Sequence, residues 1–409
     1  MKRLMFIFVT AFAAVSCTSL QHVDPYGAGT LHTLSVRTVY PDEFAEYRRE
    51  GVAVSIEEVN TGNSYTAMTD SEGVAVCRLT GGIYRVSVSD MSGYRIFNGT
   101  TEGVRLTGDM ECSVRLASSE TGAIVFKEIY CGGCSKAPEE GSYQFDKYVI
   151  LHNNSDRTQY LDGLCFGCAD PYNSSSSNNV WISTEPETGA TVFPDFVPVI
   201  QCVWQFGGSG TSFPLAPGED AVLVVCGAID HASQYPLSVN LNKEGYFVCY
   251  NNTYFTNTSY HPVPGDRIAA DHYLDVVIKT GVANAYPFSI NSPAAVIFRA
   301  EDTTIQEFVS DPDNLMAKPG SSVDTVVKIP LDWVVDAVEV FNGSSSSNLK
   351  RLQPQLDAGY VTLSAIYRGH TLHRRLNEAA SAEAGYEIYA DTNNSSADFY
   401  ERDVQSLHE

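Results

Sequence analysis

The segment from Gly51 to Val88 reads GVAVSIEEVNTGNSYTAMTDSEGVAVCRLTGGIYRVSV. Apolar and polar residues alternate in short runs such as Val52-Ala53-Val54-Ser55-Ile56, and glycine and aspartate interrupt these runs. Alternation with a period of two is typical of half-buried strands, whereas Gly, Asn and Asp are the residues that tight turns favour. The stretch therefore predicts short strands joined by turns.

The alternating pattern extends over residues 31–117 and predicts one β-sandwich. Apolar and polar residues alternate over residues 34–39, 52–56, 75–79, 84–88 and 112–116. Several short strands at this spacing, separated by turn residues, are typical of a small sandwich. We therefore expect residues 31–117 to form the first domain.

Three turn segments stand inside this domain: Thr61-Gly62, Thr69-Asp70-Ser71-Glu72-Gly73 and Gly81-Gly82-Ile83-Tyr84. Their glycines supply positive φ angles, and Asp70 is expected to cap a tight turn. Together they resemble the carboxypeptidase-regulatory module, also called transthyretin-like. The resemblance implies an immunoglobulin-like sandwich, which we interpret as a spacer in preference to a ligand-binding domain.

Residues 120–409 begin with a second set of apolar runs. Ile124–Tyr130 is followed by Phe145–Asp156, which contains His152-Asn153-Asn154-Ser155, and by Leu161-Asp162-Gly163-Leu164. Further segments follow in order at residues 214–218, 334–339 and 391–399. This succession resembles the lamin-tail domain. The resemblance implies a second immunoglobulin-like sandwich.

The second domain is longer than the ~100–150 residues that one sandwich requires. Serine-rich or aromatic-rich insertions stand at residues 172–179, 246–261 and 343–348. We therefore predict an all-β fold with two immunoglobulin-like β-sandwiches, the second enlarged by long loop insertions. Helix is expected to be scarce, with Leu372–Gly385 as the best candidate.

The first seventeen residues have the features of a bacterial lipoprotein signal. Lys2 and Arg3 precede an apolar run from Leu4 to Val15, and Cys17 follows directly after Ser16. The run is too short for a membrane span, which needs about 20 residues. The segment Ala14-Val15-Ser16-Cys17 resembles a lipobox. The resemblance implies a signal peptide over residues 1–16, a lipid on Cys17 and a flexible tether over residues 17–30.

The order of lipobox, transthyretin-like module and lamin-tail-like module resembles an uncharacterised family of Bacteroidota outer-membrane lipoproteins. This resemblance implies attachment to the outer membrane through the lipid, with the folded part facing the periplasm or the cell surface. It also suggests an outer-membrane uptake receptor as a partner.

Charge excludes one class of partner. The chain has 26 Lys and Arg against 49 Asp and Glu, which gives a formal net charge of −23. Affinity for nucleic acids and for anionic lipid headgroups comes from clustered basic residues. Nucleic acid is therefore not expected as a partner.

Two Cys-x-x-Cys pairs, Cys131/Cys134 and Cys165/Cys168, have the spacing of a four-thiolate zinc site. Outside the inner membrane an oxidising environment favours disulfides instead. Cysteine also occupies small apolar core positions. We rank disulfides or buried thiols above a metal site, and a metal site above a redox-active pair.

Aromatic residues in or beside the insertions are candidates for a ligand-binding surface. A flat ring on a loop buries a large area at low entropic cost, although most aromatic residues of a β protein lie in its core. The candidates are Trp181, Trp204, Tyr246, Tyr250, Tyr254 and Tyr260.

No catalytic motif is present in the sequence: it has no G-x-S-x-G, no H-E-x-x-H and no P-loop. No cofactor is predicted, and zinc at the cysteines or calcium at Asp311–Asn314 or Asp391–Asn394 are minor alternatives. Asx-turns account for both acidic segments.

Short acceptor patterns for O-glycosylation occur at Thr303 and Thr325. Modification is expected there if both residues lie on exposed loops.

The sequence thus favours a non-enzymatic, membrane-anchored accessory lipoprotein that binds a nutrient ligand or a partner protein. The first alternative is a structural or adhesive surface lipoprotein. The second is a carbohydrate-active enzyme without a recognisable motif, which would need two carboxylates about 5–10 Å apart in a cleft.

Overall fold

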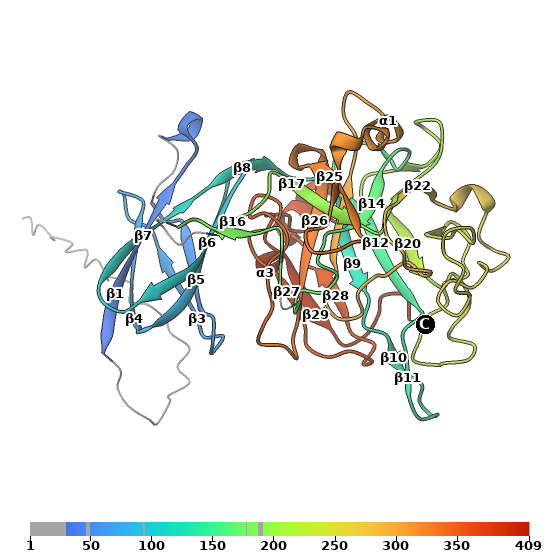
Figure 1. The fold of residues 1–409 in the computed structure, drawn as a ribbon, viewed down its shortest axis with the longest axis horizontal. Helices are drawn as coiled ribbons and strands as arrows, with labels where there is room; N and C mark the ends of the chain where they lie inside the picture. Colours follow the sequence, from blue (N-terminus) through green and yellow to red (C-terminus); the bar gives the residue numbers. More distant parts are fainter. Residues whose placement is uncertain (1–29, 46–49, 93–94, 177, 187–190, 409) are drawn as a thin grey trace, which may run out of the picture.

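The computed structural model describes residues 30–45, 50–92, 95–176, 178–186 and 191–408. Cys17, the expected signal peptide and all of the expected tether except Thr30 lie outside the described residues. The prediction of an all-β fold is confirmed, because strands arranged in several sheets dominate the chain and its helices are short. Strands β1–β8 form a smaller part and strands β9–β29 a larger part, and the two stand side by side (Figure 1). We call them the N-terminal half and the C-terminal half.

Two sheets enclose the core of the N-terminal half. The first has the order β4-β1-β7, formed by Val74–Thr80, Leu31–Val39 and Met110–Arg115. The second has the order β3-β2-β5-β6-β8, formed by Ser64–Met68, Ala53–Glu58, Gly82–Ser92, Arg95–Leu106 and Ala117–Glu120. Buried side chains alternate along β1 and β2, so both sheets turn one face toward a shared core that includes Val36, Val54 and Val86. A 3-10 helix, η1, spans Asp42–Phe44.

The turn between β3 and β4 has the hydrogen bonds that its sequence predicts. The side chain of Asp70 accepts hydrogen bonds from the backbone N–H groups of Glu72 and Val74, over 2.9 and 3.0 Å. Gly73 has a φ of +74°, a region that glycine enters without strain. The predicted Asp70-capped turn between β3 and β4 is therefore confirmed.

Two six-stranded sheets form the centre of the C-terminal half. The first has the order β21-β20-β12-β9-β28-β29, formed by Phe247–Val248, Asp220–Cys226, Lys147–Asn153, Ile124–Tyr130, Thr371–Arg374 and Phe399–Arg402. The second has the order β22-β18-β14-β23-β26-β27, formed by Asp275–Lys279, Cys202–Gln205, Cys165–Cys168, Ala294–Phe298, Val334–Asn342 and Val361–Leu363. Phe126 of β9 and Phe166 of β14 meet edge to face in the main core.

Segments outside the two six-stranded sheets cover the outer faces of both. Every residue of β12 is buried, because the segment that contains Val239 and Leu241 packs on the face opposite the main core. The second sheet is covered by a three-stranded sheet of order β17-β25-β24, formed by Phe196–Ile200, Thr325–Pro330 and Leu315–Ala317. The C-terminal half therefore has three apolar layers where a simple sandwich has one.

Short elements complete the C-terminal half. The paired strands are β10 (Cys134–Ser135) with β11 (Ser142–Tyr143), β13 (Gln159–Tyr160) with β19 (Pro214–Leu215), and β15 (Ser183–Thr184) with β16 (Thr191–Val192). The helices are α1 (Ile305–Ser310), α2 (Glu378–Ala384), α3 (Ser395–Asp398), and the 3-10 helices η2 (Ala270–His272), η3 (Pro312–Asn314) and η4 (Leu331–Trp333). None of the helices in the described ranges is long and apolar enough to cross a membrane.

Candidate functional site

A cleft of about 390 Å³ lies where the two halves of the molecule meet. One wall is the outer face of the second sheet of the N-terminal half, from β2, β3 and β5. The other wall comes from residues 358–362 and 394–401, which include β27, α3 and the start of β29. We call this space the interdomain cleft.

The N-terminal wall consists of two rows of polar side chains that run across the strands. Strand pairing aligns Thr66, Ser55, Ser87 and Thr100 across β3, β2, β5 and β6. We call these four residues the hydroxyl row. Of these four, Ser55 and Ser87 line the cleft. The hydroxyls of Ser87 and Thr100 are hydrogen-bonded to each other over 3.1 Å, and Thr100 lies within hydrogen-bond distance of the carbonyl oxygen of Ala358, at 3.0 Å.

The second row is charged and centres on Arg85. Its guanidinium forms ion pairs with Glu57 at 3.1 Å and with Glu102 at 2.6 Å. Burial disfavours the charged guanidinium, but the two carboxylates outweigh burial, and the pKa of Arg85 lies above its usual value. Arg85 is therefore a permanent cation that its neighbours already neutralise.

Tyr360 connects the two walls. Its hydroxyl donates a hydrogen bond to Glu57 over 2.6 Å, and Arg85 lies 5.3 Å from the centre of its ring. The ring stacks on Phe341 with centroids 4.0 Å apart and planes 14° apart. Burial, together with the charge of Glu57, raises the pKa of Tyr360, so the hydroxyl stays protonated and remains a donor.

Several groups in the cleft remain available to a ligand. Ser55, Ser64 and Thr362 are exposed, and in the described part of the chain their hydroxyls make no hydrogen bond. Tyr400 is 37% exposed. Glu401, by contrast, already accepts hydrogen bonds from the Ser364 hydroxyl at 2.9 Å and from His370. The cleft therefore offers free hydroxyls and an aromatic ring, while its charged groups are already paired.

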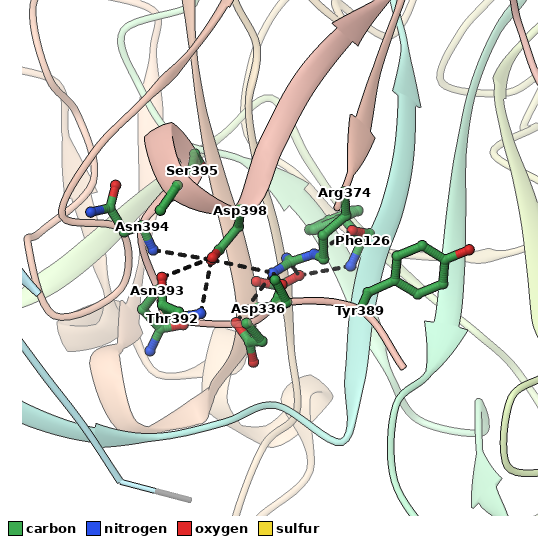
Figure 2. A network of polar contacts seen from close by, with 12 residues as sticks. Phe126, Asp336, Arg374, Tyr389, Thr392, Asn393, Asn394, Ser395 and Asp398 are labelled. Carbon is green, nitrogen blue, oxygen red and sulfur yellow. Dashed lines mark hydrogen bonds and ion pairs between the residues drawn. The ribbon is translucent and has the colours of Figure 1, made fainter. Parts of the chain in front are cut away.

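A buried network fixes the C-terminal wall. Arg374 on β28 donates to the carbonyl oxygen of Phe126 over 2.7 Å, and it pairs with Asp336 and, at 3.7 Å, with Asp398 (Figure 2). It also pairs with Asp391 at 3.2 Å. Burial raises the pKa of Asp336 above its usual range, and it raises the pKa of Asp398 to about 7. One buried guanidinium thus gathers three carboxylates.

The same network holds the loop that meets the N-terminal half. Asp398 accepts hydrogen bonds from both the backbone N–H and the hydroxyl of Thr392, each over 2.8 Å (Figure 2). The backbone carbonyls of Thr392 and Asn393 then accept hydrogen bonds from Asn98 of β6. Asp391–Asn394, the calcium alternative of the sequence, therefore works as a polar bridge between the halves. Asp311 of the other acidic segment caps η3.

A second cleft of about 380 Å³ lies near the aromatic insertion. Phe213, Phe247 and His272 line it, with Glu219 and Asp220 at its polar side. Phe247 and His272 stack with centroids 4.3 Å apart, and Phe213 stands nearly perpendicular to both rings. These rings contact one another and so leave little free aromatic face.

The predicted aromatic surface is not gathered in either cleft. Trp204 has no exposed surface and stacks on Phe255, so its prediction as a ligand contact is wrong: it is a core residue on β18. Trp181 donates to Asp170 over 2.7 Å. Tyr254 alone among the six is exposed, at 47%. Three are half-buried against other aromatic or apolar residues: Tyr246, Tyr250 and Tyr260.

The four candidate thiols do not all gather at one site, and the buried-thiol alternative describes them. Cys165 and Cys168 lie three residues apart on β14, and because successive side chains alternate, they enter different cores. Cys131 shares the main core with Cys168, while Cys134 contacts Asp146. All four are buried free thiols, and burial raises the pKa to about 12 for Cys131, Cys134 and Cys165 and to about 11 for Cys168.

Among the described residues, no group of three or more His, Cys, Asp and Glu side chains has the arrangement of a metal site. The two glycosylation candidates differ in setting. Thr303 is exposed just before α1, whereas Thr325 is half-buried at the start of β25. Only Thr303 meets the condition of an exposed loop.

Sequence reasoning missed the interdomain cleft. Ser55, Glu57, Arg85 and Ser87 occupy the polar positions of alternating strands, and such positions usually face solvent. Their opposing wall comes from residues 358–362 and 394–401, far later in the chain. The only local signal is the density of hydroxyl and charged residues on one strand face.

Comparison with known protein families finds a match in the C-terminal half. Residues 216–406 match a family described as a protein of unknown function, DUF4876. A solved structure of a DUF4876 family protein from Bacteroides thetaiotaomicron is similar at 26% identity, with a TM-score of 0.57, over 91% of this chain and 95% of that one. Because 91% of this chain is covered, the similarity includes both the N-terminal and the C-terminal half.

Two further solved structures are more distant. A DUF3823 family protein from Parabacteroides merdae has 11% identity and a TM-score of 0.18, over 44% of this chain and 83% of that one. The Bacillus anthracis TIE protein has 10% identity and a TM-score of 0.17, over 46% and 31%. No curated protein matches the chain. Over residues 216–406, slightly less than half its length, the chain is thus similar to the uncharacterised DUF4876 family.

Proposed function

We propose that this protein is a lipid-anchored, non-catalytic binding protein of the outer membrane, and that its ligand occupies the interdomain cleft. In this proposal Cys17 carries the lipid, and an uptake receptor in the same membrane receives the ligand. The lipobox-like start and the resemblance to transthyretin-like and lamin-tail modules support the anchored, modular arrangement. The N-terminal half then acts both as a spacer and as one wall of the site.

The free hydroxyls of the cleft are the observation that carries this proposal. Ser55 and Ser64 of one half and Thr362 of the other face the same space, although they belong to different parts of the chain. Tyr360 and Arg85 are held between them by stacking and ion pairing. A rigid wall with unpaired hydrogen-bonding groups is pre-organised for a ligand.

The paired carboxylates favour binding over hydrolysis. Glu57 accepts from Tyr360 and pairs with Arg85, and Glu401 accepts from Ser364 and His370. A general acid or nucleophile needs a carboxylate that is free to reach the reacting atom. Both carboxylates of the cleft are engaged in holding its walls.

The test uses retention of small molecules by the purified protein. Wild type, Ser55→Trp and Ser113→Trp are incubated with a soluble extract of the growth environment, freed of unbound material and analysed by mass spectrometry. Ser113 is a matched control because it is an exposed serine on β7, outside the cleft. We expect a compound that wild type and Ser113→Trp retain and that Ser55→Trp loses. Equal retention by all three, or no retention by any, contradicts the proposal.

A further inference from the structure

We infer that the ligand of the interdomain cleft is a neutral saccharide. This inference rests on the proposed function and adds the chemical class of the ligand. Three properties of the cleft carry it: the sign and pairing of its charges, the hydroxyl row, and the exposed ring on the opposite wall.

Charge disfavours an anionic ligand. The cleft is lined by the carboxylates of Glu57 and Glu401 and by the single guanidinium of Arg85, which also pairs with Glu102 beside the cleft. Both ion pairs of Arg85 are already made, and its guanidinium carbon lies 5.3 Å from the centre of the Tyr360 ring. The exposed Arg375 lies over the ring of Tyr400 but does not line the cleft, so a phosphate or carboxylate inside the cleft would meet excess negative charge and an already paired guanidinium.

A cationic ligand lacks a free counter-ion as well. Glu57 is shared between Arg85 and Tyr360, and Glu401 is held by Ser364 and His370. A new cation would have to share the carboxylate oxygens with these partners, so it gains less than it would at a free carboxylate.

The hydroxyl row selects for a hydrogen-bonding ligand. Ser55 is the exposed member of the row that lines the cleft without a side-chain partner in the described part of the chain, and the exposed Ser64 on β3 lines the cleft as well. An apolar ligand would remove water from these hydroxyls without replacing its hydrogen bonds, which is unfavourable. A hydroxyl both donates and accepts, so it can pair with the hydroxyls of a sugar in either sense.

The opposite wall supplies an aromatic face. Tyr400 is 37% exposed, and Arg375 lies 5.1 Å from the centre of its ring. Tyr360 stands nearby on the same wall, fixed by its stacking on Phe341. A ring of this kind buries the apolar C–H face of a sugar while the hydroxyls of that sugar reach the polar wall. Neutral saccharides combine both surfaces in one molecule.

A peptide is the competing class of ligand. β27 and β29 are edge strands of their sheets and both line the cleft, so a peptide strand could add to either one. Strand addition gains specificity from pockets for alternate side chains. The facing wall here is instead a flat array of hydroxyls and paired charges, which favours the saccharide.

The experiment titrates the mature protein with defined probes by isothermal calorimetry. The probes are neutral hexasaccharides of glucose, mannose, galactose and xylose, a hexasaccharide of galacturonic acid, and an unstructured ten-residue Ser/Thr-rich peptide. We expect at least one neutral hexasaccharide to bind, with the uronic acid probe at least tenfold weaker and the peptide silent. Preferred binding of the anionic probe or of the peptide overturns the inference.

Two pairs of variants locate the binding. Tyr400→Ala should weaken the preferred hexasaccharide about tenfold, since one aromatic contact contributes about that factor. Tyr254→Ala, which removes a more exposed ring outside the cleft, should leave the affinity unchanged. Ser55→Trp should abolish binding, and Ser113→Trp should not. Unchanged affinity in both Tyr400→Ala and Ser55→Trp places the saccharide elsewhere and overturns the inference.

The two proposals can fail separately. If the extract yields a retained compound that depends on Ser55 but contains no sugar, the cleft remains the binding site and the saccharide class is wrong. If no neutral hexasaccharide binds and the extract yields no retained compound, the proposed function itself fails. Circular dichroism of each variant establishes that a lost signal reflects the site and not unfolding.

Discussion

The side-chain amide of Asn98 donates to the carbonyl oxygen of Thr392 over 2.7 Å and to that of Asn393 over 2.9 Å. Asn98 lies on β6 of the N-terminal half and is completely buried. Thr392 is held from the other side by Asp398 and thereby by Arg374. The contact between the halves is thus continuous with the most highly charged part of the C-terminal core.

We predict that Asn98→Ala loosens this contact. The substitution removes the amide donor of two carbonyl oxygens in the contact, of which that of Thr392 keeps only a longer hydrogen bond from Ser89 at 3.5 Å, and this loss should cost about 2 kcal/mol. Differential scanning calorimetry should then show the N-terminal half unfolding earlier, as a separate transition. Asn252→Ala is the control, because Asn252 is exposed on a loop. A single transition at the wild-type temperature would show that Asn98 does not couple the halves.

We predict a pH-dependent stability that originates at Asp398. Its pKa is raised by burial from 3.8 to about 7, so the folded state binds a proton that the unfolded state releases. This contribution is fully present below about pH 4 and is lost as the pH rises to about 7. Arg374 lowers the pKa of Asp398, whereas the nearby Asp391 raises it.

Urea unfolding of wild type and Asp398→Asn at pH 5 and pH 8 measures this effect. Carboxylates elsewhere titrate in both proteins, so the informative quantity is the difference between them. We expect the stability of wild type, relative to Asp398→Asn, to fall between pH 5 and pH 8. Asp156→Asn, at a fully solvated aspartate, should track wild type. An identical pH dependence in wild type and Asp398→Asn would refute the assignment.

We predict that Trp204 and Trp181 differ in their contribution to stability. Trp204 is enclosed by Phe255 and Tyr286 in the main core, so Trp204→Ala should cost about 3–5 kcal/mol. Trp181 is half-buried and should cost less, although its indole N–H bonds to Asp170. Chemical denaturation of both variants measures the difference. Equal losses would contradict the placement of Trp204 in the core.

We predict that Cys17 determines membrane attachment. Cys17→Ala removes the sulfur that the lipobox resemblance assigns to lipid, and the protein should move from the detergent-rich to the aqueous phase of a Triton X-114 extraction. Cys112→Ala is the control, because Cys112 is a half-buried thiol of the N-terminal core. Intact mass shows whether the lipid is present. Detergent partition of the Cys17→Ala protein would exclude the lipid anchor.

Local features were predictable from the sequence because each depends on near neighbours. The runs at residues 34–39 and 75–79 lie within β1 and β4, and all but the last residue of the run at 112–116 lies within β7, because one buried face of each strand imposes alternation. The prediction of a helix over residues 372–385 was wrong at its start. The predicted helix begins as β28, which pairs with β9 and β29, and becomes helical only at Glu378. Pairing across more than 240 residues outweighed the local helix preference at Leu372.

The candidate site was less predictable than the fold. Trp204 sits beside an insertion in the sequence, yet β18 carries it into the main core. The polar face of β2 and β5 has the pattern of a solvated surface, and only the three-dimensional contact with Tyr360 makes it the wall of a cleft. Such a site depends on long-range docking, which no local pattern records.

The position of β1 has a mechanical consequence. β1 is the first strand of the described chain, and it lies between β4 and β7, paired with both. A pull applied at its N-terminal end, where the proposed membrane anchor would act, therefore loads two rows of backbone hydrogen bonds together. Resistance to such a pull is governed by the rate of forced unfolding, and breaking two rows of hydrogen bonds at once should be slower than breaking one. We therefore expect β1 to resist a sustained pulling force better than an edge strand would.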